Sequence, residues 1–142
     1  MPQRKGSASL ARFDVEEEWV SALPFDRLPK GITHLPLECV VYIPSTDGDR
    51  VISPEEFAER RDQAADLLSS LFGGCRETTA TGRYRAKDGT LISEEVAVLT
   101  GFGDADDYER KRQEFLAWLI DKRDDWGQET LGFEFEGDLW YL

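Results

Sequence analysis

The sequence predicts an α+β protein of ferredoxin-like βαββαβ topology, with an antiparallel sheet and two helices on one face. A chain of 142 residues with a 40% hydrophobic fraction is long enough to bury the core of one domain. Its apolar pattern alternates between strand and helix spacing in the order β-α-β-β-α-β, and glycine, proline or capping residues mark the changes. Right-handed crossovers then place both helices on the same side of the sheet.

The N-terminal segment differs in composition from the rest of the chain. It begins with the basic residues Arg4 and Lys5, continues through a Gly/Ser stretch, and then carries an acidic and aromatic segment at residues 13–20. Its prolines interrupt any regular element. We therefore expect residues 1–35 to be an extension of a ferredoxin-like domain that spans residues 36–142.

The first strand and the first helix open that domain. Residues 37–43 have strand composition with both faces partly apolar, which is typical of a central strand. A helix is expected after Ser53, because Pro54 suits the first helical position and Glu56 completes a capping box. Leucine, alanine and phenylalanine at helical spacing supply its buried face, and Gly73 ends it.

The second and third strands follow as a hairpin. Residues 75–85 and 91–102 have strand composition, and Asp88 and Gly89 between them are a hairpin signal in a loop of three to five residues. The two strands are expected to pair with each other.

The second helix and the last strand complete the pattern. Asp104 is the expected N-cap of a helix that runs to about residue 123. Residues 131–136 then alternate strictly between apolar and other side chains, as in a strand with one buried face. A turn at Gly137 and Asp138 makes residues 139–142 either a fifth strand or a bulged continuation of the fourth.

The composition limits the classes of partner. Twenty-nine acidic against 17 basic residues give a net charge of −12, which repels nucleic-acid phosphate. The chain has no apolar run of membrane-spanning length and no secretory h-region, so we expect a cytoplasmic protein without a membrane partner. The acidic balance suits a halophilic host, or a mesophile with a preference for arginine codons.

No catalytic residue, metal site or cofactor is predicted. The single histidine, His34, and the two cysteines, Cys39 and Cys75, lack the spacing of a zinc site, and no nucleophile and base occur in a recognisable pattern.

A resemblance extends over residues 52–98, about a third of the chain. The start I-S-P-E-E-F, the Gly73-Gly74 stop, the Asp88-Gly89 turn and the strand L-I-S-E-E-V-A-V resemble a family of small, uncharacterised bacterial proteins. That family has no assigned activity, so the resemblance implies a ferredoxin-like fold and no reaction. The topology is also similar to that of dimeric α+β barrel proteins, which pack two such sheets open face to open face and include cofactor-free monooxygenases and small-molecule sensors.

The sheet face without helices is the first candidate surface. If the odd positions of the first strand face the helices, Glu38, Val40 and Tyr42 lie on the open face. Either Val96 and Val98 or Ala97 and Leu99 join them from the third strand. Such a surface is too apolar for bare solvent. A second subunit, the N-terminal extension or a ligand is expected to cover it.

Five further residues are candidates for ligand or interface contacts. Arg83 and Arg85 flank Tyr84 and alternate to one face, where they suit a bound anion or the ordinary protection of an edge strand. Glu94 suits a general base, although pairing with an arginine of the neighbouring strand is the simpler role. Trp140 suits core or interface packing, or a stacking platform.

Two functional hypotheses follow. The leading one is a non-catalytic interaction or regulatory domain that acts as a homodimer or as a small subunit of a complex, and it makes an enzyme the less favoured reading. The alternative is a small-molecule sensor or a cofactor-free enzyme of the dimeric α+β barrel type.

Overall fold

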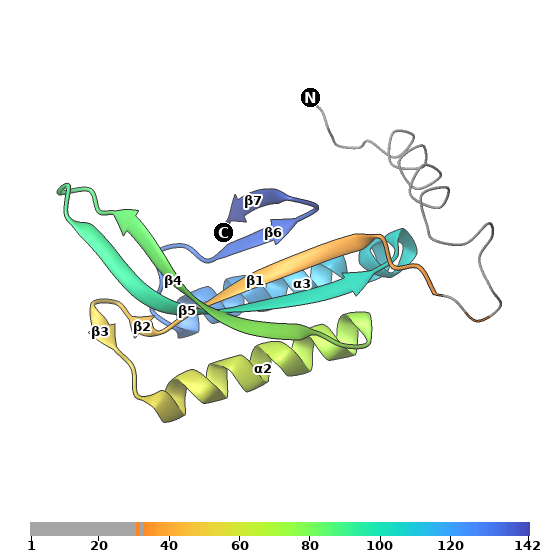
Figure 1. Ribbon diagram of the computed structural model, residues 1–142, viewed down its shortest axis with the longest axis horizontal. Coiled ribbons are helices and arrows are strands. Elements are labelled where there is room, and N and C mark those ends of the chain that lie inside the picture. Colours follow the sequence, from red (N-terminus) through yellow and green to blue (C-terminus); the bar gives the residue numbers. More distant parts are fainter. Residues whose placement is uncertain (1–30, 32) are drawn as a thin grey trace. The chain divides into compact units, whose positions relative to one another are not determined.

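An antiparallel sheet with the strand order β4-β5-β1-β6-β7 forms the centre of the computed structural model, which describes Gly31 and residues 33–142 (Figure 1). Its strands are β1 (Leu37–Pro44), β4 (Arg76–Arg85), β5 (Leu91–Gly103), β6 (Gly132–Phe135) and β7 (Asp138–Tyr141). The helices are α2 (Pro54–Phe72) and α3 (Ala105–Asp125), and a small hairpin pairs β2 (Thr46–Asp47) with β3 (Arg50–Val51). The predicted α+β ferredoxin-like fold is therefore confirmed. Most of the predicted N-terminal extension lies outside the described residues.

The central position of β1 follows from its two registers. It pairs along its whole length with β5, from Leu37 opposite Gly103 to Pro44 opposite Val96, and its middle pairs with β6. The odd-numbered side chains point into the core, where Cys39 is 2% exposed and Val41 is fully buried. The predicted orientation of this strand agrees with that burial.

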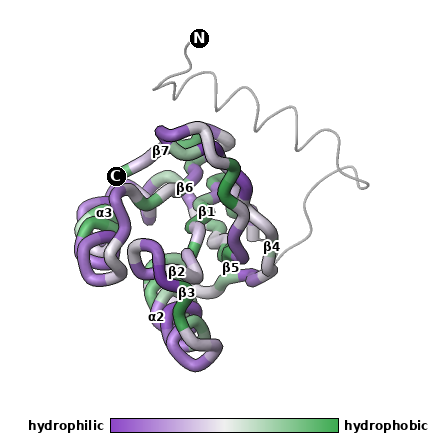
Figure 2. Tube along the Cα trace, turned by 90° about the vertical axis from the view of Figure 1, so that its left-hand side faces the viewer, coloured by the Kyte–Doolittle hydropathy of each residue, from purple (hydrophilic) through white to green (hydrophobic). Residues whose placement is uncertain are grey.

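Both helices cover one face of the sheet (Figures 1 and 2). Helix α2 begins as expected, because the Ser53 side chain accepts a hydrogen bond from the backbone N–H of Glu56 at 3.1 Å. It ends at Gly73, which has the left-handed φ of 85° and donates its N–H to the Ser69 carbonyl. The Asp104 side chain caps α3 in the same way through the Asp107 N–H at 2.7 Å.

Two glycines of β5 make room for the end of α2. A Cβ atom on Gly101 would lie 2.9 Å from the Phe72 ring, and one on Gly103 would lie 2.8 Å from it. The Phe72 ring therefore packs directly on the strand backbone. The same ring makes an edge contact with Phe115 of α3, with ring centroids 6.4 Å apart.

The C-terminal hairpin differs from the prediction by one residue. Glu136 and Gly137 form the turn, with φ angles of 56° and 86°, and Asp138 already pairs with Phe135. Positive φ at both central residues is the geometry of a type I′ turn, which matches the twist of the paired strands. Glutamate disfavours positive φ, so the pairing of β6 with β7 imposes this conformation on Glu136. Of the two alternatives, the fifth strand is the one observed.

A buried arginine ties α2 to the end of β1. Arg60 is only 6% exposed, and its guanidinium donates to the carbonyls of Pro44 and Thr46, both at 2.8 Å. It also stacks on the Trp126 ring, 5.1 Å from the centroid. Desolvation by burial lowers the pKa of Arg60, and nearby carboxylates, Asp47 first, oppose that effect.

Among the described residues, no helix is both long enough and apolar enough to cross a membrane.

Candidate active site on the open sheet face

Strand alternation determines which side chains occupy the face opposite the helices. Residues paired across strands share a face, so the registers place one row of side chains from each strand on the open side. These are Glu38, Val40 and Tyr42 of β1, Ile92, Glu94, Val96, Val98, Thr100 and Phe102 of β5, Arg76, Thr78, Ala80, Gly82 and Tyr84 of β4, Glu134 of β6, and Leu139 and Tyr141 of β7.

Tyr42 and Glu134 form the polar centre of this face. Val40 pairs with Glu134, and Tyr42 lies two residues further along the same row, so the two side chains are diagonal neighbours. The Tyr42 hydroxyl donates a hydrogen bond to Glu134 Oε2, and both residues are partly buried. The bond holds the carboxylate in one orientation.

Two further glutamates, Glu38 and Glu136, lie where the β6–β7 turn meets β1. The backbone N–H of Glu136 donates to the Glu38 carbonyl at 3.1 Å, and the Glu38 N–H donates to Glu136 Oε2 at 2.7 Å. Because Glu136 holds a left-handed φ, the turn itself brings its carboxylate back toward β1. The two glutamates are thereby held at one end of the open face.

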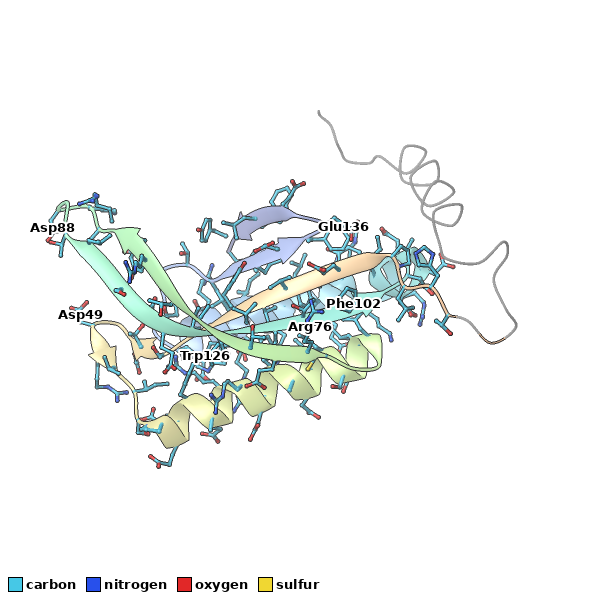
Figure 3. All side chains as sticks on the ribbon, viewed as in Figure 1. Asp49, Arg76, Asp88, Phe102, Trp126 and Glu136 are labelled. Carbon is cyan, nitrogen blue, oxygen red and sulfur yellow. The ribbon has the colours of Figure 1, made fainter. Side chains whose placement is uncertain are left out.

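Aromatic rings flank these carboxylates. Phe102 lies opposite Glu38 on β5, and the Arg76 guanidinium stacks over the Phe102 ring at 5.3 Å from its centroid (Figure 3). On the other side, the Tyr141 ring covers Gly132, where an added Cβ would lie 3.2 Å from a ring carbon. We call Glu38, Tyr42, Phe102, Glu134 and Tyr141 the open-face cluster.

The open-face cluster suits an organic cation that carries an aromatic group. It supplies two carboxylates, with Glu136 a third nearby. Among the described residues of the sheet, Arg76 is the one arginine in the open-side rows. Carboxylates attract a cation, and the faces of the rings attract it further through their quadrupoles. Ring faces also stack on a planar base. Among the described residues, no group of three or more His, Cys, Asp or Glu side chains is arranged to hold a metal ion.

The structure brings together only part of the predicted site. Val40, at 6% exposure, and Tyr42 lie on the open face as expected. Arg83 and Arg85 have the opposite orientation, since they alternate with the open-face residues of β4. Arg85 donates to the Gly89 carbonyl of its own hairpin at 2.7 Å.

The remaining candidates lie away from the open-face cluster. Tyr84 and Glu94 share the open-side rows of β4 and β5, but they lie in the outer part of the hairpin, beyond the pairing of β5 with β1. Desolvation first and the Glu94 charge second raise the pKa of Tyr84. Glu94 accepts a hydrogen bond from the Thr46 hydroxyl at 3.2 Å, and no ion pair joins it to an arginine within the described part of the chain. Trp140 pairs with Phe133 on the helix-facing side and is 53% exposed.

The sequence predicts the open-face position of Glu38 and Tyr42, and it misses the other three members of the open-face cluster. Glu134 carried a usable signal, because the alternation of residues 131–136 puts it opposite the buried phenylalanines. Its proximity to Tyr42 depends on β6 lying beside β1, which is a property of the topology. Nothing in the residues around Phe102 or Tyr141 predicts that they lie near these glutamates. Phe102 belongs to β5 and Tyr141 to β7, so their positions depend on the order of the strands in the sheet.

The fold is similar to that of solved enzymes. No protein-family model and no curated protein sequence matches the chain. A phage SAM lyase in complex with S-methyl-5′-thioadenosine matches with a TM-score of 0.57 and 16% identity, covering 81% of this chain and 95% of that one. A phage SAM lyase in the apo state matches with a TM-score of 0.53 and 16% identity, covering 81% and 94%. At this identity the similarity concerns the fold.

These neighbours correct two expectations. The leading hypothesis, a non-catalytic interaction or regulatory domain, is wrong, because the similar structures are lyases and point toward catalysis. The preference against an enzyme is wrong for the same reason. Both expectations depended on the absence of a short catalytic motif, and side chains that come together from four strands, as in the open-face cluster, form no such motif. The resemblance to an uncharacterised bacterial family stays a prediction.

Proposed function

We propose that the protein is a lyase that binds S-adenosylmethionine on its open sheet face and cleaves it to S-methyl-5′-thioadenosine. The observation that carries the proposal is the Tyr42–Glu134 hydrogen bond in a face that also presents Glu38 and the Phe102 ring. Similarity of the fold to a phage SAM lyase supports the choice of substrate.

The chemistry of the substrate matches the charges of the open-face cluster. S-adenosylmethionine carries a positive sulfonium next to an adenosine, so a carboxylate can face the cation while a ring stacks on the base. Cleavage breaks the bond between sulfur and the four-carbon amino acid chain, and the electron pair stays on sulfur. The carboxylate of the same amino acid chain forms the new bond to that carbon, so the chain leaves as a five-membered lactone and no further reactant is needed. The sulfonium thereby becomes a neutral thioether.

The loss of this positive charge determines how Glu38, Glu134 and Tyr42 contribute to binding and to the reaction. Because the positive charge disappears during cleavage, Glu38 and Glu134 contribute mainly to capture of the substrate and favour it over the neutral nucleoside product. The rate then depends on orientation, since a sulfonium held in a reactive conformation needs no further activation of its leaving group. The Tyr42 hydroxyl acts as a positioning group by holding Glu134.

The cellular setting that we propose is the cytoplasm. Cys39 and Cys75 are both free, and Cys75 is exposed at the start of β4. A free, exposed thiol suits a reducing compartment.

The decisive experiment measures S-methyl-5′-thioadenosine by liquid chromatography after incubation of the full chain with S-adenosylmethionine. A blank without protein is subtracted, because this sulfonium decomposes slowly to the same nucleoside. We expect formation above the blank, a loss of at least about tenfold in kcat/KM in Glu134→Gln, and a smaller loss in Tyr42→Phe.

Two variants serve as matched controls. Tyr84→Phe and Glu109→Gln make the same chemical changes outside the open-face cluster and are expected to keep the wild-type rate. In titration calorimetry, Glu134→Gln should weaken binding of the cationic substrate more than binding of S-methyl-5′-thioadenosine. Formation at the blank rate, or equal losses for the two ligands, would refute the proposal.

A further inference from the structure

Strand β4 is a long edge strand whose outer side is unpartnered among the described residues. It lies at the end of the strand order and pairs only with β5, over ten consecutive residues from Arg76 to Arg85 without a bulge. Nine of these residues are exposed, and Gly82 is half-buried. With β5 it forms the curved hairpin whose tip, at Asp88, projects from the rest of the sheet (Figures 1 and 3).

Ordinary protection against strand pairing is weak in β4. Edge strands usually avoid pairing through lysine, proline, bulges or short length. The segment RETTATGRYR contains no lysine and no proline, and its pairing with β5 is continuous. Its charges can still prevent pairing, but only with a partner strand that places like charges opposite one another.

The charges of β4 are instead complementary to β4 itself. We propose that β4 pairs antiparallel with β4 of a second copy of this chain, in a register centred on Ala80. A symmetric antiparallel pair must be centred on a residue, because hydrogen-bonded and non-hydrogen-bonded positions alternate along the ladder. Centring on Ala80 makes each residue i face residue 160 − i of the other copy.

This register produces three favourable kinds of cross-strand pair. Glu77 faces Arg83 of the second copy, and the pair occurs twice because the interface is twofold symmetric. Thr79 faces Thr81, which suits a hydroxyl hydrogen bond. Arg76 faces the Tyr84 ring, which suits a cation–π contact.

The existing contacts of Glu77 are compatible with this arrangement. Its Oε2 lies 3.5 Å from Arg61 Nε, and its side chain keeps 40% of its surface exposed, so a second cation can approach the carboxylate. Neighbouring registers are less complementary. Centring on Thr79 places Glu77 opposite Thr81 and so removes its ion pair. Centring on Thr81 places Glu77 opposite Arg85 and keeps an ion pair, but it places Arg83 opposite Thr79 and Arg76 opposite Ala86, so the threonine pair and the contact between Arg76 and Tyr84 are lost.

The resulting dimer has one continuous sheet. The twofold axis stands perpendicular to that sheet, so the helices of both copies lie on one side and the two open faces lie side by side on the other. This inference does not depend on the proposed reaction, since β4 contributes no residue to the open-face cluster.

Light scattering after size-exclusion chromatography tests the assembly. We expect a mass twice the 16.2 kDa of one chain at high protein concentration. Arg83→Glu places like charges opposite each other and should give the monomer, whereas Lys87→Glu makes the same charge change in the hairpin loop and should leave the dimer intact. The double variant Glu77→Arg/Arg83→Glu restores opposite charges and should restore the dimer.

Disulfide trapping tests the register. In a Cys75→Ser background, Ala80→Cys puts two thiols on the twofold axis, with Cα atoms about 4.5 to 5.5 Å apart, which a disulfide can bridge. Thr81→Cys puts them more than about 7 Å apart, which is too far. Oxidation should therefore crosslink the first variant only. A monomer at every concentration, a dimer that survives Arg83→Glu, or crosslinking of the second variant alone would overturn the proposal.

Discussion

Cys39 illustrates how a single buried position links the two faces of the sheet. Its side chain lies in the core under the helices. The side chain of the next residue, Val40, points to the opposite face, which carries the open-face cluster. Burial first and the charge of Glu38 second raise the pKa of the Cys39 thiol from 9.0 to about 12. The thiol is therefore neutral at physiological pH and is a packing group with little nucleophilic character.

This shift predicts a pH dependence of stability. The folded-state pKa lies above the ordinary value of 9.0, so the folded protein holds the thiol proton more tightly than the unfolded chain. The contribution is complete below pH 9.0 and is lost as the pH rises toward about 12, at no more than about 1.4 kcal/mol per pH unit. Urea unfolding at pH 8 and pH 10 should show a larger fall for the wild type than for Cys39→Ala. Equal falls would show that the thiol does not titrate differently in the two states.

At the scale of elements, the contact between α2 and β5 depends on two residues without side chains. The Phe72 ring packs on Gly101 and Gly103, and a methyl group at either position would overlap it. Such overlap must displace a ring that also touches Phe115 in the centre of the core. Helix α2 thus docks at a position that the two glycines define.

Gly103→Ala is expected to destabilise the protein by roughly 1 to 3 kcal/mol, because the added methyl group overpacks the core. Gly74→Ala is the matched control: nothing lies within 4 Å of its added Cβ and its φ is not positive, so its effect should stay within about 0.5 kcal/mol. Denaturant unfolding measures both values. A Gly103→Ala variant as stable as the control would mean that Phe72 can move aside at no cost.

Local signals also explain which elements the sequence predicts. The capping box at Ser53 and the glycine stop at Gly73 define α2 correctly, because both act through the backbone of their own helix. The β2–β3 hairpin escaped prediction, because two-residue strands have no periodicity. The last turn moved by one residue, because the register of β6 with β7 forces Glu136 into a conformation that its own preference opposes.

On the scale of the whole molecule, charge is the dominant surface property. A net charge of −12 makes the folded state repel itself, and dissolved salt screens that repulsion over a Debye length of about 10 Å at 0.1 M. The open-face cluster also depends on the whole fold, because four strands from both halves of the chain contribute to it. Only the fold could bring Tyr42 and Glu134, 92 positions apart, into contact.

Raising sodium chloride from about 0.1 M to about 1 M should therefore raise the melting temperature, as screening removes the repulsion. An equal increase in osmolality from sucrose serves as the reference for effects that do not involve charge. A melting temperature that falls with salt would indicate that attractive ion pairs, such as Arg61–Glu77, outweigh the repulsion.

The unequal burial of the two cysteines has a practical consequence. Cys39 is buried and stays protonated, whereas Cys75 is exposed immediately before β4. A maleimide fluorophore should consequently attach to the natural chain at one position only, at the beginning of the free sheet edge. The unaltered protein thus carries its own attachment point for a dye whose anisotropy or self-quenching reports what approaches that edge.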